Sequence, residues 1–315
     1  MIKRFVLRLV CFFLALCAVP AAYFCYVQSL PAMYRGSLMG SVLVKQETLR
    51  GTEGARILVV GGSSVPYSIE CETVAEQTGM PCIALGATAY LGIEYYLSLL
   101  HGELHEGDIV VIAPEFAMLE NSFGYSLVWM AVENSASLMR RLPLSYLPGM
   151  LTSYYTYGSG KISLYKSTGA PAQTPLEEYY GFGFGPWGDI VTPRESILEK
   201  GYDSNNTLAP DASSLSDDVV RAVNRFARYA ESAGATVVLT WAPFDELAFT
   251  GTQEGLAELE ARMEREMTPE YIGSLTDCLM PGELFYNSNN HLTSEGAALR
   301  TQMLLDDMES AGILG

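Results

Sequence analysis

Short apolar runs recur along the chain and alternate with segments of helical periodicity. The runs are rich in Ile, Val and Leu and occupy residues 57–60, 81–85, 109–112 and 235–241. Apolar residues at helical spacing mark the segments 73–78, 93–104, 216–233, 256–267 and 297–310. Short buried runs that alternate with helices predict right-handed βαβ units. We therefore expect an α/β fold in which a mostly parallel, doubly wound sheet lies between two layers of helices.

The region between the third and fourth runs breaks this rhythm. Residues 117–200 are rich in Tyr, Gly, Ser and Met, and only 127–140 has a helical pattern. We expect an insertion over the carboxyl edge of the sheet that forms one wall of a cleft. Its aromatic side chains could stack on sugar rings, face a membrane or pack the lobe itself: Tyr154, Tyr155, Tyr157, Tyr179, Tyr180, Phe182, Phe184 and Trp187. Residues 28–55 resemble a connector with little periodic structure except around 39–44.

The N-terminal segment is the most apolar part of the chain. Residues 9–27 carry no charge and are interrupted only by Pro20, which is about the length of a membrane-spanning helix. Three basic residues and no acidic one precede this stretch: Lys3, Arg4 and Arg8. The positive-inside rule then predicts a cytoplasmic N-terminus. A cleaved signal peptide is the alternative, although its apolar core is usually shorter. We expect an uncleaved anchor over residues 1–30 and an extracytoplasmic domain over 31–315.

Composition excludes several classes of partner. The formal net charge is −17, and it is more negative still outside the basic N-terminal segment. Nucleic-acid binding requires a basic surface, so we expect no nucleic-acid partner. His101 and His105 are four residues apart, a spacing that can place two ligands on one helix face, but a solvated helix end explains them better than a metal site. We predict neither a metal nor a cofactor.

Two polar stretches follow apolar runs and carry candidate chemistry. Ser63 follows Gly61-Gly62 directly after the run 57–60, so it lies at the carboxyl end of a predicted strand. There it is a candidate nucleophile, with a plain turn or a phosphate-type loop as alternatives. His291 follows a predicted short strand at 284–286 and directly precedes the last helix, which brings it to the same edge. A histidine facing a serine can take its hydroxyl proton and later return it to a leaving group.

These residues also resemble a known family. Gly61-Gly62-Ser63-Ser64, Gly86 and the block 287–296 are similar to the first, second and last motifs of the SGNH/GDSL hydrolase superfamily, whose sheet is flavodoxin-like. With the N-terminal anchor, the chain most resembles its membrane-anchored branch, which includes the D-alanyl transfer protein of teichoic acid modification and polysaccharide O-acetyltransferases. The resemblance implies Ser63 as nucleophile, with Ser64 as the lesser choice, and His291 as base. It also implies that N–H groups of Ser63 and Gly86 bind the oxyanion.

The chain departs from the family pattern at two places. The third motif normally supplies an asparagine as oxyanion donor, but here the third run leads into Ala113-Pro114-Glu115. An ionised Glu115 accepts hydrogen bonds and cannot donate one. The acid that orients the histidine usually precedes it by two to four residues, and those positions hold Asn287, Ser288 and Asn289. Asn287 could fix the imidazole tautomer, or Glu115 or Glu283 could approach the ring from another loop.

Together these features predict a serine-dependent esterase or acyltransferase that acts on acyl esters of a cell-envelope polysaccharide or teichoic acid-like polymer. By resemblance, a multi-spanning membrane acyltransferase is the expected partner. The two departures favour an alternative of another class, a catalytically silent protein of the same fold that binds glycan or scaffolds an envelope-modification complex. A periplasmic-type ligand receptor has only the α/β pattern in its favour.

Overall fold

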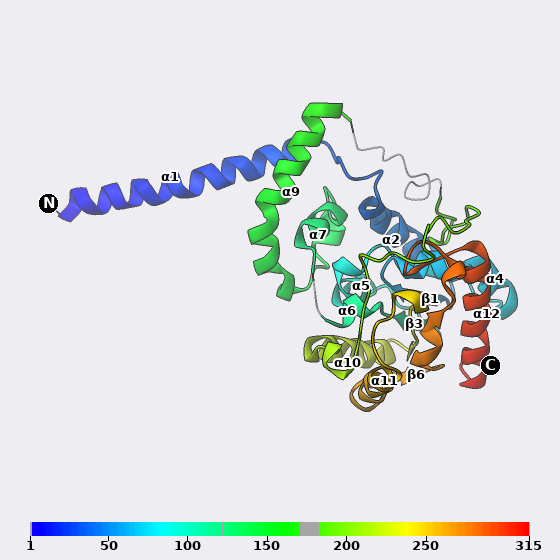
Figure 1. Ribbon diagram of the computed structural model, residues 1–315. Helices are drawn as coiled ribbons and strands as arrows, with labels where there is room; N and C mark the ends of the chain where they lie inside the picture. The colour runs from blue at the N-terminus through cyan, green and yellow to red at the C-terminus, as the bar shows by residue number, and fades with distance from the viewer. Residues whose placement is uncertain (1, 121–122, 171–182, 315) are drawn as a thin grey trace.

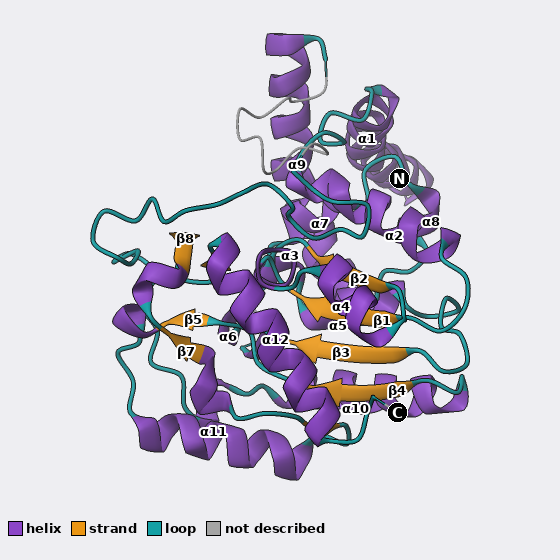
Figure 2. Ribbon diagram, turned by 90° about the vertical axis from the view of Figure 1, so that its right-hand side faces the viewer, coloured by secondary structure: helices purple, strands orange, loops and turns teal. Residues whose placement is uncertain are grey.

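A five-stranded parallel sheet forms the centre of the computed structural model, which describes residues 2–120, 123–170 and 183–314. The strand order is β2-β1-β3-β4-β6, and each neighbouring pair is parallel. The strands are β1 (Ile57–Gly61), β2 (Cys82–Gly86), β3 (Ile109–Ala113), β4 (Thr236–Leu239) and β6 (Glu270–Tyr271). Figure 2 shows the arrowheads of β1, β3 and β4 pointing to the same side. The predicted α/β class with a parallel, doubly wound sheet is confirmed.

Alternate residues of each strand contribute to two separate cores. Leu58 and Val60 face one core, and Ile57 and Val59 face the other. On the first side lie α2 (Ser41–Gly51), α5 (Ile93–Leu99), α10 (Asp217–Ser232) and α11 (Gln253–Glu266). On the second side lie α3 (Ser64–Ser68), α4 (Cys71–Thr78) and α12 (Ser294–Ser310). Helices therefore cover both faces of the sheet, as expected for a three-layer α/β/α arrangement.

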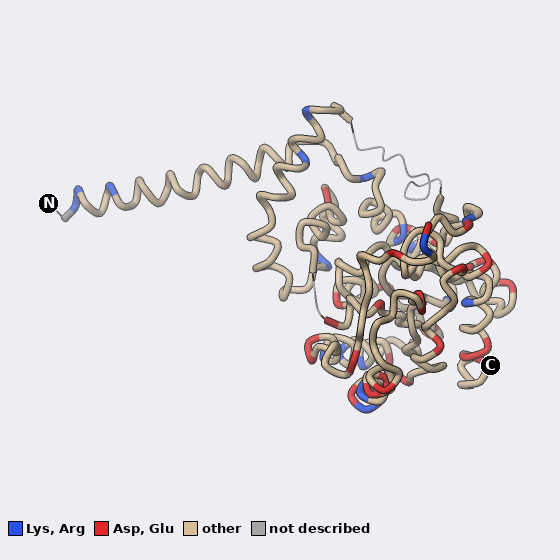
Figure 3. The backbone as a smooth tube through the Cα atoms, viewed as in Figure 1, with Lys and Arg blue, Asp and Glu red and all other residues tan. Residues whose placement is uncertain are grey.

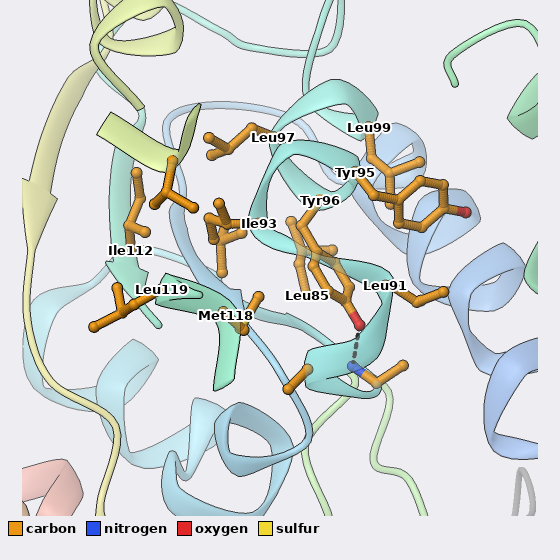
Figure 4. Close-up of a cluster of buried hydrophobic side chains, with 14 of the residues drawn as sticks. Leu85, Leu91, Ile93, Tyr95, Tyr96, Leu97, Leu99, Ile112, Met118 and Leu119 are labelled. Carbon is orange, nitrogen blue, oxygen red and sulfur yellow. Dashed lines mark hydrogen bonds between the residues drawn. The ribbon is translucent and has the colours of Figure 1, made fainter. Parts of the chain in front are cut away.

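The first core also fixes the loop that follows β2. Tyr96 of α5 packs with Leu85 and Ile112 in the cluster of Figure 4. Its hydroxyl accepts hydrogen bonds from the N–H groups of Ala87 (3.0 Å) and Thr88 (2.9 Å) and donates one to the Thr88 carbonyl (2.9 Å). A buried tyrosine thus satisfies three backbone groups of this loop.

Helix α1 (Ile2–Ser29) projects from the domain (Figure 1). Residues Lys3–Ser29 have a mean hydropathy of 2.3 in their most apolar stretch, and this stretch is not buried. Among the described residues α1 is the one helix long and apolar enough to cross a membrane, although a signal sequence has the same properties. The expected connector over 28–55 is wrong in part, because it contains α2, which packs against β2.

The inserted region contains more helix than its sequence pattern indicates. It forms α6 (Phe116–Leu119), α7 (Tyr125–Ala131), α8 (Ala136–Met139) and α9 (Leu147–Thr168). The predicted helix over 127–140 is in fact two, separated by a turn at Asn134, which has a φ of 53°. Helix α9 was not predicted. Tyr179, Tyr180 and Phe182 lie outside the described residues.

The remaining elements are short. Strand β5 (Phe244–Asp245) pairs with β7 (Leu279–Met280), and β8 (Phe285–Ser288) pairs with β9 (His291–Leu292). The strand predicted at 284–286 is therefore half of a small antiparallel hairpin rather than the last strand of the main sheet. The 3₁₀ helices are Leu38–Gly40, Ala89–Leu91, Leu144–Tyr146, Ala212–Ser214, Glu246–Ala248, Leu275–Cys278 and Gly282–Leu284.

Candidate active site

Ser63 lies between the end of β1 and the first turn of α3. The two glycines before it are required by close packing. A Cβ on Gly62 would lie 2.1 Å from Glu115 Oε1 and 2.9 Å from the Ala89 nitrogen. Gly86 is equally constrained, since a Cβ there would lie 2.1 Å from the Gly62 carbonyl oxygen. These contacts hold the turn that carries Ser63 in one conformation.

The structure brings Ser63 and His291 together from opposite ends of the chain. Ser63 Oγ lies 2.8 Å from His291 Nε2. His291 belongs to β9 and is 7% exposed, while Ser63 is half-buried. The hairpin β8–β9 contacts α3, and this packing sets the distance between the two side chains. The hydroxyl is thus within hydrogen-bond reach of a base.

An amide and an aromatic ring hold the imidazole from its other sides. His291 Nδ1 lies 2.7 Å from Asn287 Oδ1, so the Nδ1–H donates to the amide and Nε2 is free to accept from Ser63. The Tyr67 ring stacks on the imidazole at 4.0 Å between centroids. Asn289 instead bonds the backbone of Asp203 and Asn206. Within the described part of the chain, neither Glu115 nor Glu283 hydrogen-bonds the ring.

Burial controls the protonation of His291. Desolvation, with a further contribution from the nearby Arg194 guanidinium, lowers the pKa of His291 to about 3. The imidazole is therefore neutral at pH 7 and able to accept a proton. The imidazolium that forms after proton transfer is poorly stabilised, because an amide rather than a carboxylate lies behind it.

Glu115 occupies the backbone side of the nucleophile turn. It is buried, and its Oε1 accepts a hydrogen bond from the Ser64 N–H at 2.8 Å. Burial raises the pKa of Glu115 above its usual range, while hydrogen bonds from Ser64 and Ser63 oppose that shift. Ser64 itself is completely buried beside this carboxylate and does not contact His291. Of the two candidate serines, only Ser63 is paired with a base.

A cavity of about 390 Å³ opens above the Ser63–His291 pair. Its lining includes Ala89, Glu115, Glu120, Ser288 and Asn290, but not Gly86. Among the described residues of the region 117–200, only Ala117 and Glu120 line the cavity. Asn206 and Leu208, which follow that region in the chain, line it as well.

The Ala89 N–H on the cavity wall is available for an oxyanion. The N–H groups of Ala87 and Thr88 already donate to Tyr96. The N–H of Ala89 has no acceptor among residues 2–120, 123–170 and 183–314. Gly86 lies behind Gly62, where its carbonyl accepts from Lys45 Nζ at 2.5 Å.

Sequence reasoning missed three contributors to this site: Tyr67, Arg194 and Ala89. Only Tyr67 carries a local signal, since it follows Ser63 by four residues and can share a helix face with it. Arg194 and Ala89 reach the site through tertiary packing, which the spacing of residues in the sequence does not predict.

The other histidines and a larger cavity lie away from this pair. That cavity, of about 870 Å³, is lined by His101, Arg140, Arg141 and Arg225 among others, and Ser63 and His291 do not contribute to it. His101 stacks on Tyr229, and His105 bonds the Gly54 carbonyl. No cluster of three or more metal-ligating side chains occurs within the described ranges. No protein-family model and no curated protein matches this chain.

Proposed function

We propose that this chain is a membrane-anchored, serine-dependent esterase or acyltransferase that acts on acyl esters of a cell-envelope polysaccharide or teichoic acid-like polymer. The observation that carries the proposal is the 2.8 Å contact between Ser63 Oγ and a neutral His291 Nε2 at the base of a cavity. The polymer is inferred from the family resemblance, and so is a multi-spanning membrane acyltransferase as partner.

The chemistry follows from the positions of the atoms. Ser63 Oγ attacks the acyl carbonyl while His291 Nε2 takes the hydroxyl proton. The tetrahedral oxyanion accepts a hydrogen bond from the Ala89 N–H, because the Ser63 N–H is engaged by Glu115. The intermediate then collapses, the C–O bond to the alcohol breaks, and His291 returns its proton to the leaving oxygen. Water or an acceptor hydroxyl next attacks the acyl-serine and loses its proton to His291. The bond between the acyl carbon and Ser63 Oγ then breaks, and His291 returns the proton to Ser63 Oγ.

The proposed anchor is α1. Its last turns pack onto the domain, with Val27 completely buried and the Tyr23 ring stacked on Tyr155 at 5.8 Å between centroids. A segment that takes part in the fold in this way supports a retained helix rather than a removed signal peptide. The basic residues at its start favour a cytoplasmic N-terminus and an extracytoplasmic domain.

Ester turnover by matched serine variants tests the assignment. The full chain in detergent should hydrolyse p-nitrophenyl acetate, and Ser63→Ala should reduce the rate to the uncatalysed background. Ser64→Ala is the control, because its side chain does not contact His291, and it should keep most of the activity. Equal rates for wild type and Ser63→Ala would refute the proposal.

A catalytically silent, polymer-binding role is the second candidate. It is favoured by the absence of a carboxylate on His291 within the described chain and by Glu115 beside the nucleophile turn. Under this alternative, wild type hydrolyses no ester, yet it retains binding to an envelope polymer that Ser63→Ala does not weaken.

A further inference from the structure

Helix α9 lies across the end of α1 that enters the domain (Figure 1). The two helices approach closely because α9 has a glycine at the crossing. A Cβ on Gly158 would lie 2.6 Å from Tyr23 Oη and 3.0 Å from Val27 Cγ2. The Tyr23 hydroxyl also donates to the Tyr155 carbonyl at 3.3 Å. The level at which α9 sits along α1 is therefore fixed by direct contacts.

The inner face of α9 is locked to the domain. Lys161 Nζ lies 2.9 Å from Glu133 Oε1, and both side chains are buried. Trp129 of α7 donates from Nε1 to the Met150 carbonyl at 2.7 Å and stacks on Tyr157. A buried ion pair and a buried indole hold α9 in one rotation about its axis. Its outer face cannot turn inward without breaking these contacts.

That outer face is apolar and exposed. Leu147, Leu151 and Tyr155 follow one another at intervals of four residues and are 45%, 76% and 72% exposed. This spacing aligns them along one side of the helix. Leu144, in the turn just before α9, is 81% exposed. A continuous apolar stripe of this kind indicates a contact surface.

The length of α1 brings this stripe to the level of a membrane surface. About 20 helical residues cross the roughly 30 Å hydrocarbon core. Counted from Leu9, which follows the last basic residue of the N-terminal segment, such a span ends at about residue 28. The crossing with α9 falls at Tyr23 to Val27, just inside that limit. Tyr154 and Tyr155 gather at the crossing, and such aromatic rings are typical of the membrane interface.

Charge distinguishes this region from the rest of the protein. No acidic residue occurs between Glu133 and Glu177, although the chain has 36 acidic residues and a net charge of −17. In Figure 3 the tube of α9 carries blue segments but no red one, whereas red segments are frequent over the α/β domain. An anionic lipid surface repels carboxylates, so the acid-free side is the one that can approach it.

We propose that α9 lies in the interface of an anionic lipid bilayer, with Leu147, Leu151 and Tyr155 facing the acyl chains. This second membrane contact would hold the catalytic domain against the surface in one orientation. The inference rests on the proposed function of α1 as an anchor. The occupant of the stripe is lipid, since the stripe is level with the end of the span and free of acids.

Spin labels on single cysteines test this placement in the full chain. Cys11, Cys17 and Cys25 are exposed and would be replaced by serine, whereas Cys71, Cys82 and Cys278 are buried and can stay. The reporters are L151C on α9, F13C within α1 and L299C on α12, all at exposed positions. The protein is reconstituted into vesicles of phosphatidylglycerol and phosphatidylcholine, and oxygen and a water-soluble nickel chelate compete as relaxation agents.

We expect the label at L151C to behave like that at F13C, with oxygen access above nickel access, and the label at L299C to show the reverse. If L151C matches L299C while F13C is in lipid, the anchor stands and the placement of α9 is overturned. The stripe would then serve a protein partner. If F13C itself is in water, the anchor and the placement of α9 fall together.

Discussion

The Tyr67 ring lies flat against the His291 imidazole, with 4.0 Å between centroids and 5° between planes. Tyr67 is carried by α3, the helix that begins beside Ser63, so one short element carries both Ser63 and the ring that stacks on His291. Arg194 lies 5.5 Å from the Tyr67 ring and adds positive charge near the imidazole. The ring is thus oriented toward Ser63, but no carboxylate in the described part of the chain hydrogen-bonds its protonated form.

Asn287→Asp should increase the ester hydrolysis rate. The new carboxylate would take the place of an amide oxygen 2.7 Å from Nδ1 and stabilise the imidazolium. The reverse change in a serine protease costs about 10⁴ in kcat, so we expect a gain of about tenfold or more. Steady-state kinetics measure it, with Asn205→Asp as control because Asn205 is exposed and does not contact His291. An unchanged or lower kcat in Asn287→Asp would contradict the role given to the amide.

Glu115→Gln should also raise kcat. The amide oxygen can keep the hydrogen bond from the Ser64 N–H, while the negative charge near the developing oxyanion is removed. In other enzymes, removal of one oxyanion-hole donor lowers kcat by about 10²–10³. Removal of a negative charge from the same region should therefore raise kcat by about tenfold. Glu120→Gln is the matched control, since Glu120 lines the same cavity but does not hydrogen-bond Ser64. If both substitutions raise kcat equally, the gain comes from the lower negative charge of the cavity and not from the position of Glu115 beside Ser64, which would contradict this prediction.

The low pKa of His291 predicts a specific loss of stability in acid. Its pKa is about 3 in the folded protein, below the ordinary value of 6.5. Between these values the unfolded chain binds a proton that the folded chain does not, so this contribution is complete above about pH 6.5 and is lost as the pH falls toward 3. Urea unfolding at about pH 7 and pH 4.5 should show a larger loss for wild type than for His291→Gln. Equal losses would show that His291 titrates normally.

Ester hydrolysis should also persist to a lower pH than it does in an enzyme whose histidine base has an ordinary pKa. Since His291 stays neutral down to a pKa of about 3, the acidic limb of the kcat/KM profile should lie well below pH 6. A limb near pH 6.5 would mean that the ring is more solvated than its 7% exposure indicates.

The sheet and the two candidate residues Ser63 and His291 were predictable because their signals are local. The run ending at Gly61 is rich in β-branched residues and bounded by glycine, and it forms β1 as expected. His291 was expected at the same edge as Ser63, and it lies there, although on a hairpin outside the main sheet. Tyr96, which bonds the loop after β2, and Arg194 act through contacts distant in sequence, which periodicity does not reveal.

Helix α9 shows why part of the fold was not predictable. Pro148, Gly149, Gly158 and Gly160 lower its intrinsic helix propensity, and its sequence looked loop-like. In the folded protein Gly149 accommodates the Tyr125 ring and Gly158 the crossing with α1. The glycines that make the sequence of α9 look like a loop are the same residues that allow the helix to pack closely.

Breaking a buried ion pair at the opposite end of the sheet should cost more stability than breaking an exposed one. Arg56 Nη2 lies 2.6 Å from Asp108 Oδ2, and both side chains are essentially unexposed. Asp108→Asn leaves the guanidinium without its counter-charge and should cost about 3–5 kcal/mol of unfolding free energy. Asp218→Asn, in an exposed pair with Arg221, should cost at most about 1 kcal/mol. Urea titration of the detergent-solubilised chain measures the unfolding free energy of both variants. Similar losses for Asp108→Asn and Asp218→Asn would contradict the larger contribution expected from the buried pair.

The central claim is that Ser63 is a nucleophile activated by His291. Treatment of the full chain with a fluorophosphonate, followed by peptide mass spectrometry, tests it directly, because an activated hydroxyl displaces fluoride and keeps the phosphonyl group. We predict one adduct on Ser63 that disappears in Ser63→Ala and falls sharply in His291→Gln, while Ser64→Ala is labelled like wild type. An unlabelled wild-type protein, or an adduct on Ser64 instead, would contradict the claim.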